Sequence, residues 1–375
     1  MKVATIVGTR PEVIKLSRVI AELDACCEHV LIHTGQNYDY TLNQVFFDQL
    51  GIREPDHFLE VAGENLGETI GNVIAHSYDV LLSEAPDAVL LLGDTNSCLS
   101  VISAKRLKIP VFHMEAGNRC FDERVPEEIN RRMIDHASDI NLTYTEHARR
   151  YLLAEGVRPE TVIKTGSPMR EVLDFYQEGI DSSDAIERLG LQAGRYLLVS
   201  AHREENVDSP GNLRDLLDTL NALNEKYRIP VIVSTHPRTR KRLDEIGIPA
   251  NEAGVKFIEA LGFLDYVKLE MHATCVLSDS GTITEESSIL GFPAVTIRQA
   301  HERPEGMDEG TLIMCGLGRE RVLEAVDVVV RQHAGGQPPF RMVPDYEPDN
   351  VSKKVVRLIL SYTDYVNRVV WRKPV

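Results

Sequence analysis

Short apolar runs rich in Val, Ile and Leu alternate along this chain with longer segments in which apolar residues recur at helical spacing. Runs of this kind are typical of buried parallel strands, and the segments between them are typical of the helices that connect such strands. The clearest runs begin at residues 3, 29, 88, 109, 140, 195, 229, 274 and 293. The pattern therefore predicts an α/β protein built on parallel sheets.

The alternation is interrupted near residue 168 by Gly, Ser and Pro, and then restarts. We therefore predict two α/β domains, residues 1–168 and 169–355. The last segment, 356–375, is predicted to be helical and to pack back on the first domain. Polar sequence follows eight predicted strands, and open parallel sheets bind ligands beyond the carboxyl ends of their strands. We expect one cleft between two facing domains.

The composition limits the possible partners. The 375 residues carry 41 Lys and Arg against 57 Asp and Glu, a formal net charge of −16, and 43% are hydrophobic. These values fit a folded globular protein and exclude a disordered or fibrous chain. The acidic balance argues against nucleic acid and anionic membranes as partners. Any anionic ligand must therefore be bound by a concentrated cluster of Arg, Lys and His.

Location and cofactors are addressed by two further features of the sequence. No uncharged apolar run reaches about 18 residues, and the N-terminus becomes charged too early for a secretion signal, so we expect a cytoplasmic protein. The six cysteines form no CxxC pair and show no Cys/His ligand spacing. We interpret them as reduced thiols, and we expect neither a metal nor an organic cofactor.

The first motif, GTRPEVIK, follows the first predicted strand at residues 8–15. Thr9 and Glu12 match a capping box, and Pro11 suits a first helical turn, so the start of a helix explains part of the motif. That explanation does not cover Arg10 and Lys15. Two cations beside a helix N-terminus make an anion site plausible.

A second candidate anion site follows the predicted strand that begins at residue 274. Ser280, Gly281 and Thr282 open a helix there, and the N–H groups of such a turn can hold a diphosphate. Thr282 and Glu285 are also predicted to form a capping box. That leaves Glu286 as the candidate to accept hydrogen bonds from ribose hydroxyls.

The second half places many cationic side chains at neighbouring predicted strand ends. They are His202, Arg203, His236, Arg238, Arg240, Arg298, His301 and Arg303. A single His at a strand end is usually structural. The repetition favours phosphate recognition.

The first half offers carboxylates instead, at Asp94, Glu115 and positions 122, 123, 127 and 128. Carboxylates near a cationic phosphate site can act as general acids and bases, since burial near one another raises at least one pKa. For Glu127 and Glu128 the alternative is that they follow Pro126 in a first helical turn and stabilise the helix dipole. Asp94 and Glu115 have no such simple alternative.

Several common sites are unsupported by the sequence. No GxGxxG follows the first strand, so a nicotinamide or flavin site is not expected. The chain also has no GxxxxGK[ST] motif and no GxSxG motif. Kinase-like P-loop chemistry and serine hydrolysis are therefore not expected.

Seven motifs occur in a fixed order along nearly the whole chain: GTRPEVIK, GDTNS, EAG…R…PEEINRR, HREEN, HPRTR, SDSGTITEE and HERPE. Together they resemble the non-hydrolysing UDP-N-acetylglucosamine 2-epimerase family. The resemblance implies a glycosyltransferase-B-like fold of two Rossmann-like domains, with UDP held mainly by the C-terminal domain and the sugar in the cleft. It also implies a homodimer.

Within this family, EAGNRCFDERVPEEINRR, SAHREENVDSP and SDSGTITEESS are most similar to the branch that makes UDP-N-acetyl-L-fucosamine for surface polysaccharides. That branch inverts C2 of UDP-2-acetamido-2,6-dideoxy-L-talose. The residues that depart from the more common epimerases are Asn118, Cys120, Ala201, Thr282 and Thr284. The alternative substrate is UDP-N-acetylglucosamine.

The chemistry follows from the sugar itself. C2 of a 2-acetamido sugar has no adjacent carbonyl, so a free carbanion is prohibitive, and without a nicotinamide site the open route is loss of UDP from C1. A base would take the C2 proton as UDP leaves, and UDP would return to the 2-acetamidoglycal as a proton reaches the other face. Two acid/base groups are required, with cations that stabilise the leaving diphosphate.

The resemblance assigns roles to individual residues. The predicted catalytic residues are Asp94, Glu115, Glu127 and His202, and the predicted UDP-binding residues are Arg10, Lys15, His236, Arg238, Ser280, Gly281, Thr282, Glu286 and Arg303. Which carboxylate is the base and which is the acid stays open. The alternative functions are a glycosyltransferase of the same fold, a hydrolysing epimerase and a non-catalytic nucleotide-sugar sensor.

Overall fold

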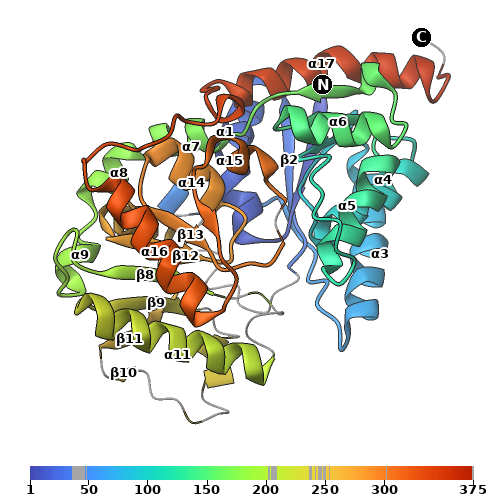
Figure 1. The fold of residues 1–375 in the computed structure, drawn as a ribbon. Coiled ribbons are helices and arrows are strands. Elements are labelled where there is room, and N and C mark those ends of the chain that lie inside the picture. The colour runs from blue at the N-terminus through green and yellow to red at the C-terminus, as the bar shows by residue number, and fades with distance from the viewer. Residues whose placement is uncertain are drawn as a thin grey trace. The chain divides into compact units, whose positions relative to one another are not determined.

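The computed structural model describes residues 1–35, 47, 49–201, 203, 209–235, 239–240, 242–243, 247, 251–252, 254–300 and 302–373. The chain divides into two compact units (Figure 1). Unit 1 contains Met1–Phe175 and Asp345–Val375, and unit 2 contains Tyr176–Pro344. The domain boundaries at residues 168 and 355 stay a prediction from the sequence. Within the described part of the chain, no helix is both long enough and apolar enough to cross a membrane.

Unit 1 is built on a seven-stranded sheet in which every strand pair is parallel. Its strands, in spatial order, are β3 (His57–Phe58), β2 (Glu28–His33), β1 (Lys2–Val7), β4 (Ala88–Leu92), β5 (Val111–Met114), β6 (Ile140–Thr143) and β7 (Val162–Lys164). Its helices are α1 (Arg10–Cys26), α3 (Leu66–Glu84), η1 (Asn96–Ser100), α4 (Val101–Arg106), α5 (Pro126–Ala137), α6 (Glu146–Ala154), η2 (Pro159–Thr161), α7 (Met169–Phe175) and α17 (Val351–Val369). Helices α3, α4 and α5 pack on one face of the sheet, and α1 packs against α7 and α17.

Unit 2 has a second seven-stranded sheet, parallel except for its β10–β11 pair. Its strands, in spatial order, are β10 (Asn251–Glu252), β11 (Val255–Glu259), β9 (Val231–Thr235), β8 (Leu197–Ser200), β12 (Cys275–Ser278), β13 (Ala294–Thr296) and β14 (Ile313–Met314). Its helices are α8 (Gln177–Ser182), α9 (Ala185–Arg188), α11 (Pro210–Tyr227), α13 (Phe263–His272), α14 (Ile283–Leu290), α15 (Pro304–Glu309) and α16 (Arg319–His333), and η3 (Pro344–Tyr346) spans the boundary with unit 1.

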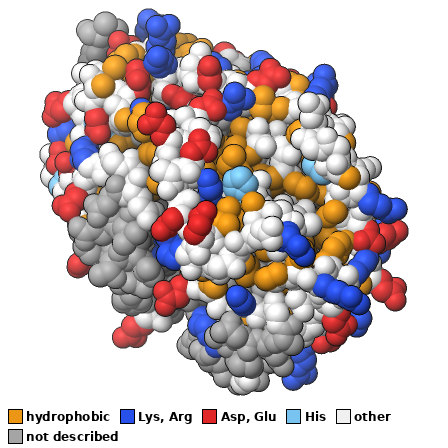
Figure 2. Space-filling view, turned by 90° about the vertical axis from the view of Figure 1, so that its left-hand side faces the viewer, with side chains coloured by type: hydrophobic (Ala, Val, Ile, Leu, Met, Phe, Trp, Pro, Cys, Tyr) orange, Lys and Arg blue, Asp and Glu red, His pale blue; other side chains and the backbone are white. Residues whose placement is uncertain are grey.

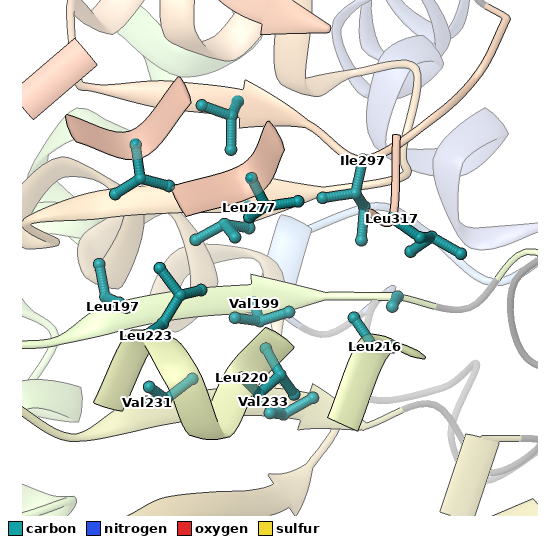
Figure 3. Packing of buried hydrophobic residues seen from close by; sticks show 14 of the residues in the cluster. Leu197, Val199, Leu216, Leu220, Leu223, Val231, Val233, Leu277, Ile297 and Leu317 are labelled. Carbon is teal, nitrogen blue, oxygen red and sulfur yellow. The ribbon is translucent and has the colours of Figure 1, made fainter. Parts of the chain in front are cut away.

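The core of unit 2 explains why its strands read as continuous apolar runs. Leu197 and Val199 of β8 face Leu220 of α11, and Leu277 of β12 lies in the same cluster (Figure 3). Helices α9, α13 and α14 cover the opposite face of the sheet. Because both faces are covered, each central strand is apolar at nearly every position. Full burial of one such Leu or Val side chain contributes about 1.5–3 kcal/mol.

The strand order creates one special position in each sheet. In unit 1 the order reverses between β1 and β4, and in unit 2 it reverses between β8 and β12. At such a switch point the connections leave in opposite directions, which opens a crevice beyond the carboxyl ends of the two strands. The segments that leave these ends are Gly8–Arg10 and Gly93–Asp94 in unit 1 and Ala201–Arg203 and Asp279–Gly281 in unit 2. The GTRPE, GDTN and SDSGT motifs all lie there.

The described strands include five that the apolar pattern missed: β3, β7, β10, β11 and β14. Four of them have two or three residues and form the edges of the two sheets, with β11 next to an edge. A strand this short has too few positions to show a period. In β11 the sequence VKFIE mixes charged and apolar residues, so no continuous apolar run marks it.

Candidate active site

The turn after β1 is held by a buried carboxylate, that of Glu12. Helix α1 begins at Arg10, and Glu12 in its first turn accepts hydrogen bonds from the backbone N–H groups of Gly8 at 2.5 Å and Thr9 at 3.1 Å. Its other oxygen accepts from the hydroxyls of Thr95 and Ser97 beyond β4. The capping role predicted for Glu12 is present, but the link to the neighbouring strand end was missed because sequence spacing does not show contacts between strands.

Lys15 meets Glu115, one of the predicted acid/base residues. Lys15 lies one turn into α1, and its Nζ is 2.5 Å from Oε2 of Glu115, with both side chains largely buried. The Asn118 amide donates to the other carboxylate oxygen of Glu115 at 3.4 Å. The predicted diphosphate lysine and the predicted acid/base glutamate are therefore direct neighbours.

The loop after β5 gives Glu115 an unusual backbone conformation. Its φ is +62°, in the left-handed region, and Gly117 follows at φ +83°. A Cβ at Gly117 would lie 2.4 Å from the carbonyl oxygen of Ala148, so no larger residue fits there. The Gly117 N–H donates to the buried carboxylate of Asp135, which also accepts from Arg119 at 2.7 Å. This buried network of Gly117, Asp135 and Arg119 fixes the backbone of the loop that carries Glu115.

Asp94, beyond the neighbouring strand β4, is held by a cation from α5. Arg131 donates to Oδ2 of Asp94 through Nε at 3.1 Å and Nη2 at 2.5 Å. The Asn130 amide donates to the Asp94 carbonyl oxygen at 3.0 Å. Since β4 and β5 are paired in the sheet, Asp94 and Glu115 follow adjacent strand ends, as the sequence predicts.

The two carboxylates at the start of α5 differ in environment. Glu127 is half-buried, whereas Glu128 is fully buried. Glu128 accepts hydrogen bonds from the backbone N–H groups of Cys120 and Phe121 and from Arg131. The structural interpretation of Glu128 is therefore supported, although it anchors the preceding loop rather than only stabilising the helix dipole.

The turn before α14 in unit 2 uses some of its own N–H groups. The Ser280 N–H donates to the hydroxyl of Ser278 at 3.0 Å, and the Thr282 N–H donates to the hydroxyl of Ser280 at 3.3 Å. The predicted capping box of Thr282 and Glu285 is wrong, because the side chain of Thr282 makes no cap hydrogen bond. Glu285 instead lies 2.9 Å from Arg303.

Three of the predicted phosphate-site arginines of unit 2 contact carboxylates or backbone oxygens. Arg298 makes two hydrogen bonds to Glu302 at 2.6 and 2.8 Å, and Arg303 donates to the carbonyl oxygen of Gly281 at 3.1 Å. Arg203 donates to the carbonyl oxygen of Asp279 at 3.0 Å. These arginines hold the turns around the predicted phosphate site. The predicted His202, His236, Arg238 and His301 lie outside the described residues.

Sequence reasoning also missed a buried carboxyl group close to Glu286. Glu270 of α13 is fully buried, and Glu286 is 7% exposed. Burial, with the nearby charge of Glu286, raises the pKa of Glu270 well above its ordinary value, while the Tyr266 hydroxyl opposes the rise. The only sequence signal was a charged residue at a position that shares a helix face with buried Val267 and partly buried Tyr266.

Surface charge and metal-binding capacity add little to these sites. On the face shown in Figure 2, acidic and basic side chains are interspersed, and neither sign forms a broad area.

Unit 2 also has a pocket of about 300 Å³. It is lined by Arg298, Gln299, Met314, Cys315, Gly316, Leu317 and Gly318. Within the described ranges, no group of three or more His, Cys, Asp or Glu is arranged to hold a metal ion.

The sequence and the fold of this chain are similar to those of known proteins. Residues 21–360 match the family profile described as UDP-N-acetylglucosamine 2-epimerase. The chain belongs to this family. A solved UDP-N-acetylglucosamine 2-epimerase from Rickettsia bellii is 56% identical to this epimerase, covers all of both chains and has a TM-score of 0.92.

Two further relatives show the range of the family. The solved UDP-GlcNAc 2-epimerase of Methanocaldococcus jannaschii in complex with UDP-GlcNAc and UDP is 33% identical, covers 96% of this chain and 100% of that chain, and has a TM-score of 0.89. A UDP-2,3-diacetamido-2,3-dideoxy-D-glucuronate 2-epimerase of Pseudomonas aeruginosa is 35% identical over 331 residues, 87% of this chain and 91% of the relative.

These likenesses confirm the predicted fold and enzyme class. The epimerase has two Rossmann-like α/β domains of the glycosyltransferase-B-like kind, and it is a non-hydrolysing epimerase. The relatives carry different sugars in their names, so the predicted L-fucosamine branch and the roles of the individual site residues stay predictions.

Proposed function

We propose that this epimerase inverts C2 of a UDP-linked 2-acetamido sugar by eliminating UDP and adding it back. The observation that carries the proposal is the buried contact of 2.5 Å between Lys15 and Glu115 at the strand ends of a 2-epimerase family member. A carboxylate for proton transfer and a cation for the leaving diphosphate are the two groups that elimination requires. Here they lie side by side.

Asp94 and Glu115 are proposed as the two proton-transfer groups, with Glu127 beside them. Arg131 and Lys15 each hold one of these carboxylates in a fixed position. Elimination removes the C2 proton to one carboxylate as the C1–O bond to UDP breaks, leaving a C1–C2 double bond. Re-addition forms the C1–O bond again as the other group delivers a proton to the opposite face of C2.

Unit 2 is proposed to bind UDP through the turn before α14. The diphosphate would take the Thr282 N–H, whose present bond to Ser280 is long at 3.3 Å, and the backbone of Gly281. Glu286 is proposed to accept from the ribose hydroxyls, and Arg10, Lys15, His202, His236 and Arg238 to contact the phosphates. Arg303 fits a supporting role better than direct contact, because it is buried against Gly281 and Glu285.

As the substrate, UDP-2-acetamido-2,6-dideoxy-L-talose is proposed first and UDP-N-acetylglucosamine second. The relative named for a diacetamido-glucuronate shows that the family includes members with other sugars. Asn118, one of the residues that departs from the common pattern, donates to Glu115. One of the residues that depart from the common pattern therefore contacts a proposed catalytic carboxylate directly.

Proton NMR in heavy water tests the proposal. The purified epimerase is offered each UDP-sugar separately, and the C2 proton and the C1–phosphate coupling are followed. We expect deuterium at C2 in a new epimer that still carries UDP, faster with the L-talose derivative. Net release of UDP would identify a hydrolysing epimerase, and consumption only with an added acceptor would identify a glycosyltransferase. Binding without exchange would identify a sensor.

The epimerase is further proposed to be a homodimer through unit 1. Large apolar side chains are exposed on two helices that pack against each other, Ile102 on α4 and Ile129 and Met133 on α5. Light scattering coupled to gel filtration would give twice the chain mass for the wild-type protein. A double substitution of Ile129 and Met133 by Glu would give a monomer, and a monomeric wild type would contradict the proposal. The cytoplasmic location stays a prediction.

A further inference from the structure

Four hydrogen-bond donors converge on the carboxylate of Glu12. The side chain is 2% exposed. Two donors are backbone N–H groups of its own turn, at Gly8 and Thr9. The other two are the hydroxyls of Thr95 and Ser97, which follow β4 and lie more than 80 residues away in the chain. The carboxylate therefore joins two strand ends that flank the switch point of unit 1.

A helix cap alone does not require the second pair of bonds. Glu68 in the first turn of α3 provides the comparison inside the same chain. Its carboxylate is exposed and accepts the backbone N–H of Glu64 at 2.7 Å, as an N-terminal cap should. Glu12 performs the same local task but is buried and reaches a different segment. Its position therefore needs an explanation beyond the stability of α1.

We propose that Glu12 is a positioning residue for the epimerisation, which fixes the turn carrying Arg10 against the turn carrying Asp94. Thr9, whose N–H it accepts, directly precedes Arg10, and Thr95, whose hydroxyl it accepts, directly follows Asp94. The inference rests on the proposed function of Arg10 at the diphosphate and Asp94 at the sugar. A displacement of about 1 Å between two such groups can lower turnover by about 100-fold.

The protonation state of Glu12 controls this link. Burial raises the pKa of Glu12 to about 7, against the opposing effect of its four hydrogen bonds. A protonated carboxyl must donate, and only the hydroxyls of Thr95 and Ser97, which are 2.6 Å apart, can turn to accept. Besides Glu12, the titratable or charged groups on the two segments that it joins are Asp94 and Cys98, which follow β4, and Arg10 and Lys15 on α1. The arrangement in which all four groups donate to the carboxylate is therefore progressively lost as the pH falls below about 7.

Glu12→Gln tests the inference, with Glu68→Gln as the matched control. The glutamine keeps the size of the side chain but replaces one acceptor oxygen by an NH₂ donor, which can be satisfied only if the hydroxyl of Thr95 or Ser97 turns to accept. We expect kcat for C2 inversion to fall by at least about 10-fold while KM changes by less than about threefold. The wild-type kcat should fall as the pH drops below 7, and Glu12→Gln should lose that dependence. The proposal would be overturned if Glu12→Gln had the same kcat as the wild type, or if its kcat depended on pH as the wild-type kcat does.

A second set of variants covers the case in which Glu12→Gln does not fold. Thr95→Val and Ser97→Ala remove the partners on the other side of the link. Each should lower kcat, and the Thr95→Val/Ser97→Ala double variant should lower it by less than the product of the two single effects, because either change already weakens the same link. Independent, multiplying effects would contradict a shared role.

Wild-type turnover separates this inference from the proposed function. If the wild type inverts neither sugar, the proposed function fails and the link is judged by hydrogen exchange instead. Faster exchange at residues 93–97 in Glu12→Gln than in wild type and Glu68→Gln would support the positioning of this turn by Glu12. Equal exchange in all three proteins would refute it.

Discussion

The two units hold the carboxyl groups near their switch points in opposite ways. In unit 1 the proposed catalytic carboxylates meet cations directly, Glu115 with Lys15 and Asp94 with Arg131. In unit 2, burial and the nearby charge of Glu286 raise the pKa of Glu270 well above its ordinary value, which favours its neutral form. Arg203, Arg298 and Arg303 there hold the supporting turns.

The difference teaches what each unit is built to do. A carboxylate held against a cation has a fixed position for proton transfer, and its cation can also stabilise an anionic leaving group. In the described part of unit 2, buried arginines instead hold the turns that follow the strands. We therefore propose that unit 1 supplies the proton-transfer carboxylates and that unit 2 mainly binds UDP.

The strongest test of this division is Glu115→Gln. Loss of one proton-transfer group should lower turnover by about 100-fold or more, while the affinity for UDP changes little. The amide oxygen can still accept from Lys15, which limits the damage to the fold. The measurement is steady-state epimerisation beside UDP titration calorimetry, with Asp174→Asn on α7 as an exposed control. Turnover near wild type would remove Glu115 from the mechanism.

The converse change in unit 2 is Glu286→Gln. A lost charge-assisted hydrogen bond to the ribose should weaken UDP binding by about 10-fold or more, because such bonds contribute about 1.5–3 kcal/mol. Turnover at saturating substrate should fall much less than in Glu115→Gln. Comparing the change in kcat with the change in KM for each of the two variants tests the proposed division between proton transfer in unit 1 and UDP binding in unit 2. A kcat loss in Glu286→Gln as large as that in Glu115→Gln would break it.

Much of this arrangement could be predicted from the sequence, and the reason is local. Arg10, Asp94, Glu115 and Ser280 each directly follow an apolar strand, so the topology of a parallel sheet places them at its carboxyl edge. The contacts of Glu12 with Thr95 and of Glu285 with Arg303 could not be predicted, since they join segments whose distance depends on strand order. The capping box at Thr282 failed for a local reason, because Thr282 has helical backbone angles and its hydroxyl pairs with that of Ser280 at 3.0 Å.

A smaller effect should appear in the pH dependence of stability. The pKa of Glu270 is higher in the folded than in the unfolded protein, so its contribution to stability is complete below the unfolded pKa near 4.5 and is lost as the pH rises toward the folded pKa. The slope reaches about 1.4 kcal/mol per pH unit for one proton. Glu270→Gln should remove this slope in thermal unfolding followed from pH 5 to 8. An unchanged slope would show that Glu270 ionises normally.

The smallest expected effect is on substrate choice. Asn118→Leu removes the 3.4 Å hydrogen bond to Glu115 at a position where this chain departs from the more common epimerases. The ratio of kcat/KM for the L-talose and glucosamine substrates should shift toward glucosamine by about 10-fold, the scale of one pocket contact. Competition between the two substrates in one NMR tube gives the ratio. An unchanged ratio would place the specificity elsewhere in the loop.

The return of the chain to unit 1 has a consequence for synthesis and for fragments. Asp345 caps α6 through the N–H of Glu146 at 2.9 Å, and Glu171 accepts the N–H of Ser352 at the start of α17 at 2.8 Å. Helix α17 then packs along α1. Unit 2 is one uninterrupted piece of chain, whereas unit 1 consists of two segments, and the second of them follows unit 2 in the sequence. The fold of unit 1 can therefore be completed only after all of unit 2 has been synthesised, and a fragment that ends before Asp345 lacks the residue that caps α6 and the helix that packs along α1.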